Sequence, residues 1–188
     1  MKKLIAIVGM SGSGKSIATD YLEEKGWTKL YFGGITYKLM KEAGIERTED
    51  GKSEKEFREK LRQEHGPECY AKFLEEDIRK ALEEHDVVLD GLYSWHEYLY
   101  LIERFPDLKL ICIVVDKNIR YERVGKRVDR PFNRQDIEYR DLSEIENLAK
   151  GGPIAYADYY LLNNDNIDCY INRLHEILKE MENQEGKM

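Results

Sequence analysis

The residues with the clearest chemical meaning form a glycine-rich segment near the start of the chain. Residues 9–16, GMSGSGKS, fit the pattern G-x-x-x-x-G-K-[ST] of nucleotide phosphate-binding loops. In such a loop, backbone N–H groups point at phosphate oxygens, and the N-terminus of the following helix favours negative charge. We expect Lys15 to reach the β- and γ-phosphates of ATP and the Ser16 hydroxyl group to bind Mg²⁺. The expected nucleotide-binding residues are Gly9, Ser11, Gly12, Ser13, Gly14, Lys15 and Ser16.

A carboxylate that could complete this site lies much further along the chain. Asp90 ends a short apolar run and is followed by Gly91. A carboxylate at the carboxyl end of a strand beside a phosphate-binding loop can hold Mg²⁺ or its waters, or accept the proton of an acceptor hydroxyl group. The simpler alternative is an aspartate that only caps the following turn. With the loop upstream, we expect Asp90 to be both a metal ligand and a catalytic residue.

Cationic side chains are concentrated between residues 120 and 134 of an otherwise acidic chain. Phosphoryl transfer gains from cations that meet the developing charge, and the planar guanidinium of arginine binds two oxygens at once. Because residues 128–133 resemble a mobile connection, we expect Arg127 and Arg130 to be catalytic residues on a lid formed by residues 127–135. For Arg120 we expect only a solvated position on a helix.

The acceptor of the phosphoryl group would need its own binding residues. Lys38 and Arg62 could receive a phosphate group of the acceptor, although a lysine or arginine taken alone is more often a surface cation. Tyr93 could stack on an acceptor base, with packing in the core as the alternative. We expect these three residues to form the acceptor site, with the first two in a helical insert over residues 33–85.

The elements that must position these residues alternate along the chain. Apolar runs at residues 3–8, 28–32, 86–90, 108–115 and 159–162 predict strands, and the intervening segments have helical spacing. Ser53-x-x-Glu56 and Ser94-x-x-Glu97 are typical of capping boxes at helix starts, and Asp116 is a further expected cap. This alternation favours a single three-layer α/β domain over residues 1–188 with a parallel sheet. We expect the tail at 183–188 to be frayed.

Composition excludes several other classes of protein. The 188 residues include 41% hydrophobic residues, enough for a substantial core, and carry a net charge of −7, which argues against a general nucleic-acid binder. No apolar run is as long as a membrane span, and no signal peptide precedes the first strand, so we expect a cytoplasmic protein without a membrane partner. The three cysteines are widely spaced, which indicates reduced thiols rather than a zinc site or disulfides.

Taken together, these motifs resemble the P-loop nucleoside-monophosphate kinase superfamily. More closely, the chain is similar to an uncharacterised, largely archaeal family of nucleotide-kinase-like ATPases related to dephospho-coenzyme A kinase. The resemblance implies a five-stranded parallel sheet in the order 2-3-1-4-5, a lid and a helical acceptor-binding insert. This chain differs from that family at Tyr93, where the family commonly has an arginine. It differs from adenylate kinase-like enzymes in the helix after the second strand, where they use an arginine and the nearest cation here is Lys38. The segments that carry it are residues 9–15, 61–67, 88–91, 140–141 and 157–159, and Asn163.

Two functions fit these expectations. The first is an ATP-dependent small-molecule kinase whose acceptor is a nucleoside monophosphate or a nucleotide-like molecule such as dephospho-coenzyme A. The nucleophile is a phosphate oxygen in the first case and a ribose hydroxyl group in the second, for which Asp90 is a suitable general base. The second function is a switch that hydrolyses ATP and acts on a protein partner. The presence of an insert and an arginine-rich lid favours the kinase.

Overall fold

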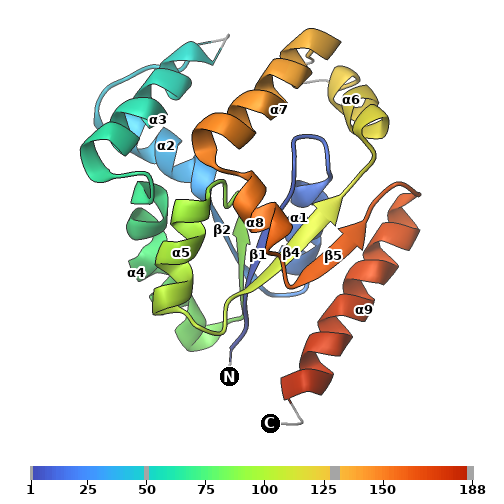
Figure 1. Cartoon of the computed structure of the whole chain (residues 1–188). Helices are drawn as coiled ribbons and strands as arrows, with labels where there is room; N and C mark the ends of the chain where they lie inside the picture. Colours follow the sequence, from blue (N-terminus) through green and yellow to red (C-terminus); the bar gives the residue numbers. More distant parts are fainter. Residues whose placement is uncertain (1, 49–50, 128–131, 186–188) are drawn as a thin grey trace.

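The computed structural model describes residues 2–48, 51–127 and 132–185. Within them, five strands form one parallel sheet in the order β2-β3-β1-β4-β5, as expected (Figure 1). The strands are β1 (Leu4–Val8), β2 (Thr28–Tyr31), β3 (Val87–Asp90), β4 (Lys109–Val114) and β5 (Tyr159–Leu162). The helices are α1 (Lys15–Glu24), α2 (Phe32–Glu42), α3 (Lys52–His65), α4 (Cys69–Glu84), α5 (Trp95–Arg104), α6 (Lys117–Gly125), α7 (Arg134–Leu148), α8 (Gly151–Ala155) and α9 (Ile167–Glu185).

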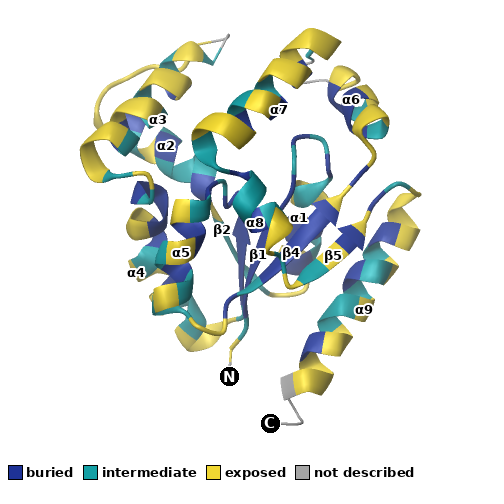
Figure 2. Cartoon of the chain, viewed as in Figure 1, coloured by how far each residue is buried: buried dark blue, intermediate teal, exposed yellow. Residues whose placement is uncertain are grey.

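The sheet is covered by helices on both faces. Side chains of α4, α5 and α8 pack on one face, where Leu4, Ala6 and Val8 of β1 also point. Side chains of α1 and α9 pack on the other face against Ile5 and Ile7. A central strand that is buried on both sides explains why β1 is apolar at every position, and its burial is visible in Figure 2.

The register of the sheet brings the two chemically important strand ends together. In the pairing of β1 with β3, Ile7 lies beside Asp90. The phosphate-binding loop, residues 9–16, begins one residue after β1 ends. The loop and Asp90 therefore lie at the same carboxyl edge of the sheet, where α/β proteins bind ligands.

The helical insert, residues 33–85, divides into two parts. Helix α4 buries Tyr70, Leu74 and Ile78 in the core and thus covers the sheet. Helices α2 and α3 lie beyond the carboxyl ends of the strands, on the opposite side of the loop from α6 (Figure 1). Within the insert, therefore, α2 and α3 are the helices that lie near the carboxyl edge of the sheet.

Some helix ends differ from the sequence expectations. The capping box of α5 is present, since Ser94 Oγ accepts a hydrogen bond from Glu97 N at 3.0 Å. The box expected at Ser53 is wrong: α3 begins earlier, after Gly51 in a left-handed conformation, and Ser53 Oγ donates to Glu46 O at 3.0 Å. The side chain of Asp116 also makes no capping hydrogen bond, although α6 begins after it.

The C-terminal part of the chain contains more helix than expected. Helix α9 continues to Glu185, so the tail expected to fray from residue 183 is helical over its first three residues, and residues 186–188 lie outside the described part. Helix α8 was not expected, because its sequence GGPIA has no helical pattern. No helix among the described residues is long and apolar enough to cross a membrane.

Candidate functional site

The phosphate-binding loop has a backbone shape that its glycines permit. Gly12 and Gly14 have φ angles of 81° and 95°, in the left-handed region that glycine adopts without strain. A Cβ atom on Gly12 would lie 2.8 Å from the carbonyl oxygen of Arg120, and one on Gly14 would lie 2.6 Å from Asn163 Nδ2. Each glycine therefore allows both the turn and close contact with the elements behind the loop.

Three surrounding elements hold the carbonyl oxygens of this loop. Arg120 Nη1 on α6 donates to Ser11 O at 2.8 Å, and Asn163 Nδ2, just after β5, donates to Ser13 O at 2.9 Å. The hydroxyl group of Tyr170 on α9 donates to Gly14 O at 2.9 Å. These three contacts hold carbonyl oxygens of the loop. The backbone N–H groups at the start of α1 are the groups that would bind an anion.

Lys15 lies in an environment where a bound anion would stabilise its ammonium group. Its Nζ donates to Gly9 O at 2.9 Å and to Met10 O at 3.1 Å. Burial and the nearby ammonium group of Lys150 lower the pKa of Lys15 to about 7. In addition, the hydroxyl oxygen of Ser13 is fully buried and has no hydrogen-bond partner among the described residues. An unpaired buried polar atom and a crowded ammonium group both fit a bound phosphate.

Asp90 is held beside the first turn of α1. Thr19 Oγ1 donates to Asp90 Oδ2 at 3.2 Å and lies 3.1 Å from Ser16 O. Lys29 Nζ lies 3.8 Å from the same carboxylate. Burial raises the pKa of Asp90, with the charge of Lys29 opposing that shift. Asp90 is thus fixed by contacts on one side while it remains close to Ser16.

The oxygens of Ser16 and Asp90 fit a magnesium site in which a bound nucleotide supplies the other ligands. The described residues contain no group of three or more His, Cys, Asp or Glu side chains that could hold a metal ion by itself. Mg²⁺ commonly binds through one or two protein oxygens, with the remaining positions filled by phosphate oxygens and water. The Ser16 hydroxyl group and the Asp90 carboxylate provide oxygens of this type.

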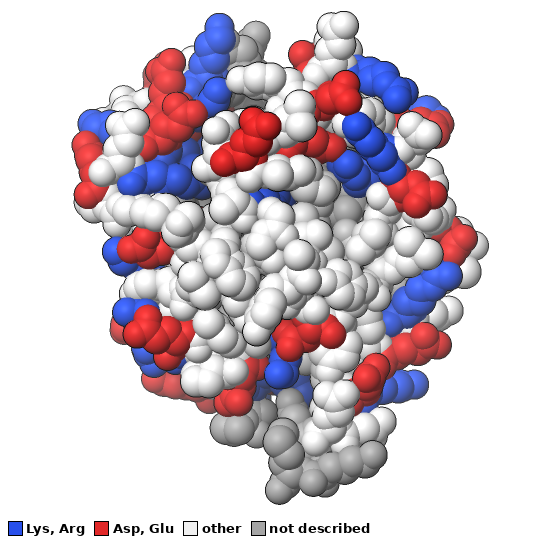
Figure 3. Space-filling view, in the orientation of Figure 1, with Lys and Arg blue, Asp and Glu red and all other residues white. Residues whose placement is uncertain are grey.

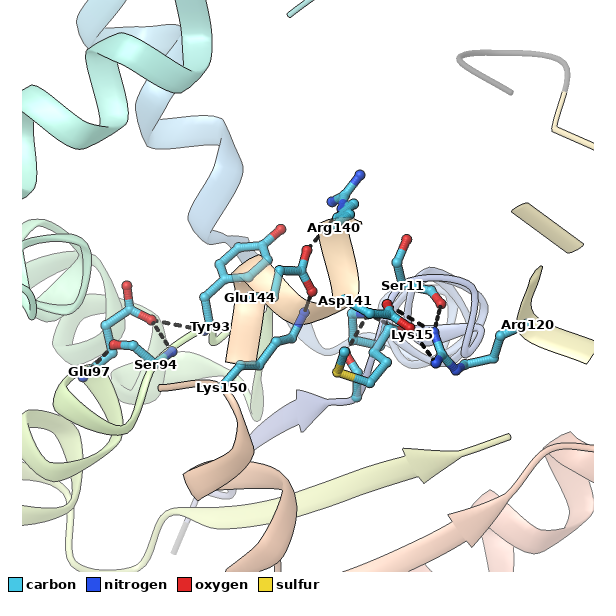
Figure 4. Close-up of polar contacts among 12 residues, drawn as sticks. Ser11, Lys15, Tyr93, Ser94, Glu97, Arg120, Arg140, Asp141, Glu144 and Lys150 are labelled. Carbon is cyan, nitrogen blue, oxygen red and sulfur yellow. Dashed lines mark hydrogen bonds and ion pairs between the residues drawn. The ribbon is translucent and has the colours of Figure 1, made fainter. Parts of the chain in front are cut away.

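A second set of charges faces the loop from α7 and the turn after it. In this set, which we call the α7 cluster, Glu144 binds both Arg140 and Lys150 (Figure 4). Arg140 Nε donates to Glu144 Oε1 at 2.9 Å, and Lys150 Nζ donates to the other oxygen. Burial alone would raise the pKa of Glu144, but the charges of Lys150 and Arg140 lower it to about 2. The cluster therefore carries a net positive charge beside Lys15.

Of the two arginines expected on the lid, the structure describes Arg127 but not Arg130. Partial desolvation and the positive charge of Arg140 lower the pKa of Arg127, which places these two cations near each other. Arg130 lies outside the described residues, as do residues 128–131 of the expected lid. Arg140, on α7, is a described arginine whose charge acts on Lys15 of the loop.

The three expected acceptor residues have different surroundings. Lys38 is exposed on α2. Arg62 packs over the ring of Tyr70, with 5.1 Å from its guanidinium carbon to the ring centroid, and its Nε has no partner among the described residues. Tyr93 is half-buried beside the α7 cluster, because Lys150 Nζ lies 5.0 Å from the centroid of its ring. Of the three, Tyr93 is the one that contacts the α7 cluster.

The expectation that Arg120 is a solvated cation is wrong. Arg120 is only 7% exposed, and its guanidinium group binds Asp141 with N–O distances of 3.2 and 2.6 Å. The same group holds the loop through Ser11 O. The spacing of charges on α6 does not show that Arg120 is buried, because its partner Asp141 lies on another helix, 21 residues later in the chain.

Other parts of the site were not expected as site residues. Arg140 and Asn163 belong to the segments that carry the family resemblance, but no local pattern assigns them a role. Glu144 and Lys150 lie six residues apart, which is not a helical spacing, so nothing in the sequence pairs them. They meet because the backbone turns sharply at Ala149, the only described non-glycine residue with a positive φ angle, 51°.

The sheet order and the glycine-rich loop define a P-loop protein with a three-layer α/β fold, and sequence comparison identifies its family. Residues 5–146 match the family model described as an AAA domain. The chain is 31% identical to a UPF0200 protein of Thermococcus gammatolerans, over 95% of both chains. It is 32% identical to a UPF0200 protein of Thermococcus kodakarensis, over 95% of this chain and 97% of that one. The chain belongs to the AAA domain family and to the UPF0200 proteins.

Solved structures share the fold at lower sequence identity. TT1252 from Thermus thermophilus aligns with a TM-score of 0.65 at 18% identity, over 95% of this chain and 97% of that one. A gluconokinase from Sinorhizobium meliloti gives 0.60 at 17% identity, over 98% and 97%. A dephospho-CoA kinase from Campylobacter jejuni gives 0.58 at 17% identity, over 96% and 97%.

Proposed function

We propose that this protein is a kinase that transfers the γ-phosphoryl group of ATP to a small molecule. We further propose that the acceptor is a nucleoside monophosphate or a nucleotide-like molecule such as dephospho-coenzyme A. The observation that carries the proposal is that Asp90, at the end of β1's neighbour β3, and Arg140 of α7 both lie close enough to Lys15 of the phosphate-binding loop for their charges to act on its ammonium group. The names of the gluconokinase and the dephospho-CoA kinase with the same fold support it.

Each residue of the site has a distinct task in this reaction. The loop amides and Lys15 bind the β- and γ-phosphates, and Arg140 neutralises charge on the transferring group from the side of α7. Ser16 and Asp90 would hold Mg²⁺, which would neutralise charge on the phosphate groups. An acceptor oxygen forms a bond to the γ-phosphorus, and the bond from that phosphorus to the bridging oxygen breaks, with its electron pair leaving on ADP.

The role of Asp90 depends on the acceptor. A hydroxyl acceptor loses a proton as it attacks, and the Asp90 carboxylate can accept that proton, directly or through water. The raised pKa of Asp90 suits this task, because it makes the carboxylate a better base. A phosphate-oxygen acceptor needs no base, and Asp90 then serves the metal alone.

The position of the acceptor follows from the arrangement of elements. Helix α7 lies between the phosphate-binding loop and helices α2 and α3, and Tyr93, shortly after β3, lies on the side of α7 away from the loop (Figures 1 and 4). We propose that the acceptor lies against Tyr93, with Lys38 and Arg62 as its further binding residues. The face shown in Figure 3 has acidic and basic side chains interspersed at its edges and no extended basic stripe, which supports a small acceptor over a nucleic acid on this face.

The experiment that tests the proposal measures ADP release from ATP and Mg²⁺ in the presence of individual acceptors. The panel contains nucleoside monophosphates, deoxynucleotides and dephospho-coenzyme A, with Lys15→Ala as the inactive control. Acceptor-dependent ADP release that the control lacks supports the kinase and identifies its substrate class. Slow hydrolysis that no acceptor accelerates contradicts the kinase and favours a switch that acts on a protein partner.

A further inference from the structure

Lys150 is buried more deeply than a structural role requires. Its side chain is 2% exposed, which makes it the most buried lysine or arginine among the described residues. Burying an ammonium group costs several kcal/mol, and an apolar residue of similar size would usually fill such a place at lower cost. The lysine therefore needs an explanation beyond packing.

The backbone before Lys150 is bent in a way that aims the side chain into the site. Ala149, at the end of α7, adopts φ 51° and ψ 36°, a left-handed conformation that is unfavourable for a residue with a Cβ atom. The chain changes direction here between α7 and α8 (Figure 1). Strain of this kind persists where the surroundings impose it, often at functional sites.

The ammonium group of Lys150 lies between the two halves of the proposed reaction. On one side is Lys15 of the phosphate-binding loop, whose pKa it helps to lower. On the other side is Tyr93, where the acceptor is expected. Figure 4 shows the Lys150 side chain extending between them to Glu144. The burial of Lys150 lowers its own pKa, and the Glu144 carboxylate opposes that shift.

We propose that Lys150 is a second phosphoryl-binding lysine, which neutralises the oxygens of the group in transfer from the side of the acceptor. This inference rests on the proposed function. Glu144 is the counter-ion of Lys150 while the site is empty, and the phosphoryl oxygens share the ammonium group when the site is filled. Lys150 stays protonated throughout and forms no covalent bond, so the balance of the transfer step is unchanged.

The test compares Lys150→Met with Lys150→Arg, and uses the exposed Lys80→Met on α4 as a matched control. Two quantities are measured: the rate of γ-phosphoryl transfer to an acceptor or to water, and the affinity for Mg²⁺–ADP with and without aluminium fluoride, which mimics the group in transfer.

Loss of one contact to the group in transfer typically lowers the rate by about 10²-fold. We expect that loss for Lys150→Met, with a similar loss of fluoroaluminate affinity and an ADP affinity within about threefold of wild type. Lys150→Arg keeps the charge and should retain most of the fluoroaluminate affinity.

A purely structural role for Lys150 predicts a different pattern. Lys150→Met leaves Glu144 buried without its partner, so the single variant can lose activity through loss of stability alone. The double variant Glu144→Gln/Lys150→Met removes both charges and should recover stability in chemical denaturation. If it also recovered the wild-type rate and fluoroaluminate affinity, the inference would be overturned.

These outcomes separate the inference from the proposed function. If no acceptor accelerates ADP release, the kinase proposal fails, but hydrolysis and the fluoroaluminate complex still involve a γ-phosphoryl position and still test Lys150. If wild type binds ADP no more tightly with aluminium fluoride than without it, or if Lys150→Met retains the wild-type increase, Lys150 is not a phosphoryl ligand.

Discussion

Lys15 donates to carbonyl oxygens of the loop to which it belongs, so its ammonium group already has partners before any phosphate arrives. Those carbonyl groups carry no formal charge and compensate only part of the cost of burying a cation. The low pKa of Lys15, about 7, is the consequence. A phosphate favours the charged form, so nucleotide binding and proton binding at Lys15 must be linked.

The first prediction follows from the sign of this linkage. Above about pH 7.5 the empty protein has largely lost the Lys15 proton, whereas the nucleotide complex retains it. Binding of Mg²⁺–ADP should therefore take up as much as one proton, and the Kd should rise with pH by up to about tenfold per unit. Calorimetry in two buffers with different ionisation enthalpies measures this uptake. Lys15→Arg stays protonated and should abolish it; a wild-type protein that takes up no proton would contradict the shifted pKa.

Asn163 gives a second prediction at the scale of one residue. It is 5% exposed, and its amide group holds the loop through Ser13 O at 2.9 Å. Asn163→Ala leaves that carbonyl without this partner, which should lower the free energy of unfolding by about 1–3 kcal/mol and weaken Mg²⁺–ADP binding. Urea denaturation and nucleotide titration measure the two effects. The exposed Asn147→Ala on α7 is the matched control, and equal behaviour of the two variants would show that the Asn163 contact does not shape the loop.

The residues of this site differ in how well the sequence predicts them. The phosphate-binding loop was predictable, because its shape depends on consecutive residues. Asp90 was predictable because an apolar run fixes its place at a strand end. The pair of Glu144 and Lys150 was not, because it depends on one residue, Ala149, in a conformation that alanine rarely adopts.

At the scale of elements, α6 and α7 are joined through one buried ion pair. Arg120 and Asp141 are 7% and 6% exposed, and the same arginine holds Ser11 O of the loop. A buried pair need not stabilise the fold relative to apolar residues, but removing one partner leaves a charge without compensation. The relative position of α7 and the phosphate-binding loop therefore depends on both charges being present.

The third prediction concerns this pair. Arg120→Ala should lower the free energy of unfolding by about 3–5 kcal/mol, because it leaves the Asp141 carboxylate buried and unpaired. Arg120→Met/Asp141→Leu removes both charges and should be less destabilised than the single variant. Chemical denaturation of the two variants and wild type measures the difference. A double variant as unstable as the single one would mean that the hydrogen bond from Arg120 to Ser11 O, rather than the unpaired Asp141 carboxylate, accounts for the loss.

The elements themselves were largely predictable for local reasons. Strands β1 and β4 are continuous apolar runs, and the capping box of α5 involves residues three apart. The box expected at Ser53 failed because the same hydroxyl group can serve the preceding turn instead. Helix α8 could not be predicted, because its place is set by packing of Ile154 against the core and of Gly152 against Trp95.

At the scale of the whole molecule, the site is assembled from nearly the full length of the chain. The loop is held by hydrogen bonds from α6, from the residue after β5 and from α9. Its shape therefore depends on residues that follow it by more than 100 positions in the chain, as far as Tyr170. The order of the strands followed from a family resemblance rather than from periodicity, because hydrophobic patterns do not specify which strands are neighbours. The loop therefore exists in its binding shape only when the domain is folded.

A site that exists only in the folded state should stabilise that state when it is filled. At a ligand concentration about a hundredfold above Kd, Mg²⁺–ADP should add about 2.7 kcal/mol to the free energy of unfolding. For a domain of this size each kcal/mol raises the Tm by about 2–4 °C, so the expected rise is about 5–10 °C. Thermal unfolding with and without nucleotide measures it. Lys15→Ala should show a much smaller rise at the same concentration, because it lacks the ammonium group that meets the phosphates. An equal rise in both proteins would mean that the nucleotide binds somewhere other than the phosphate-binding loop.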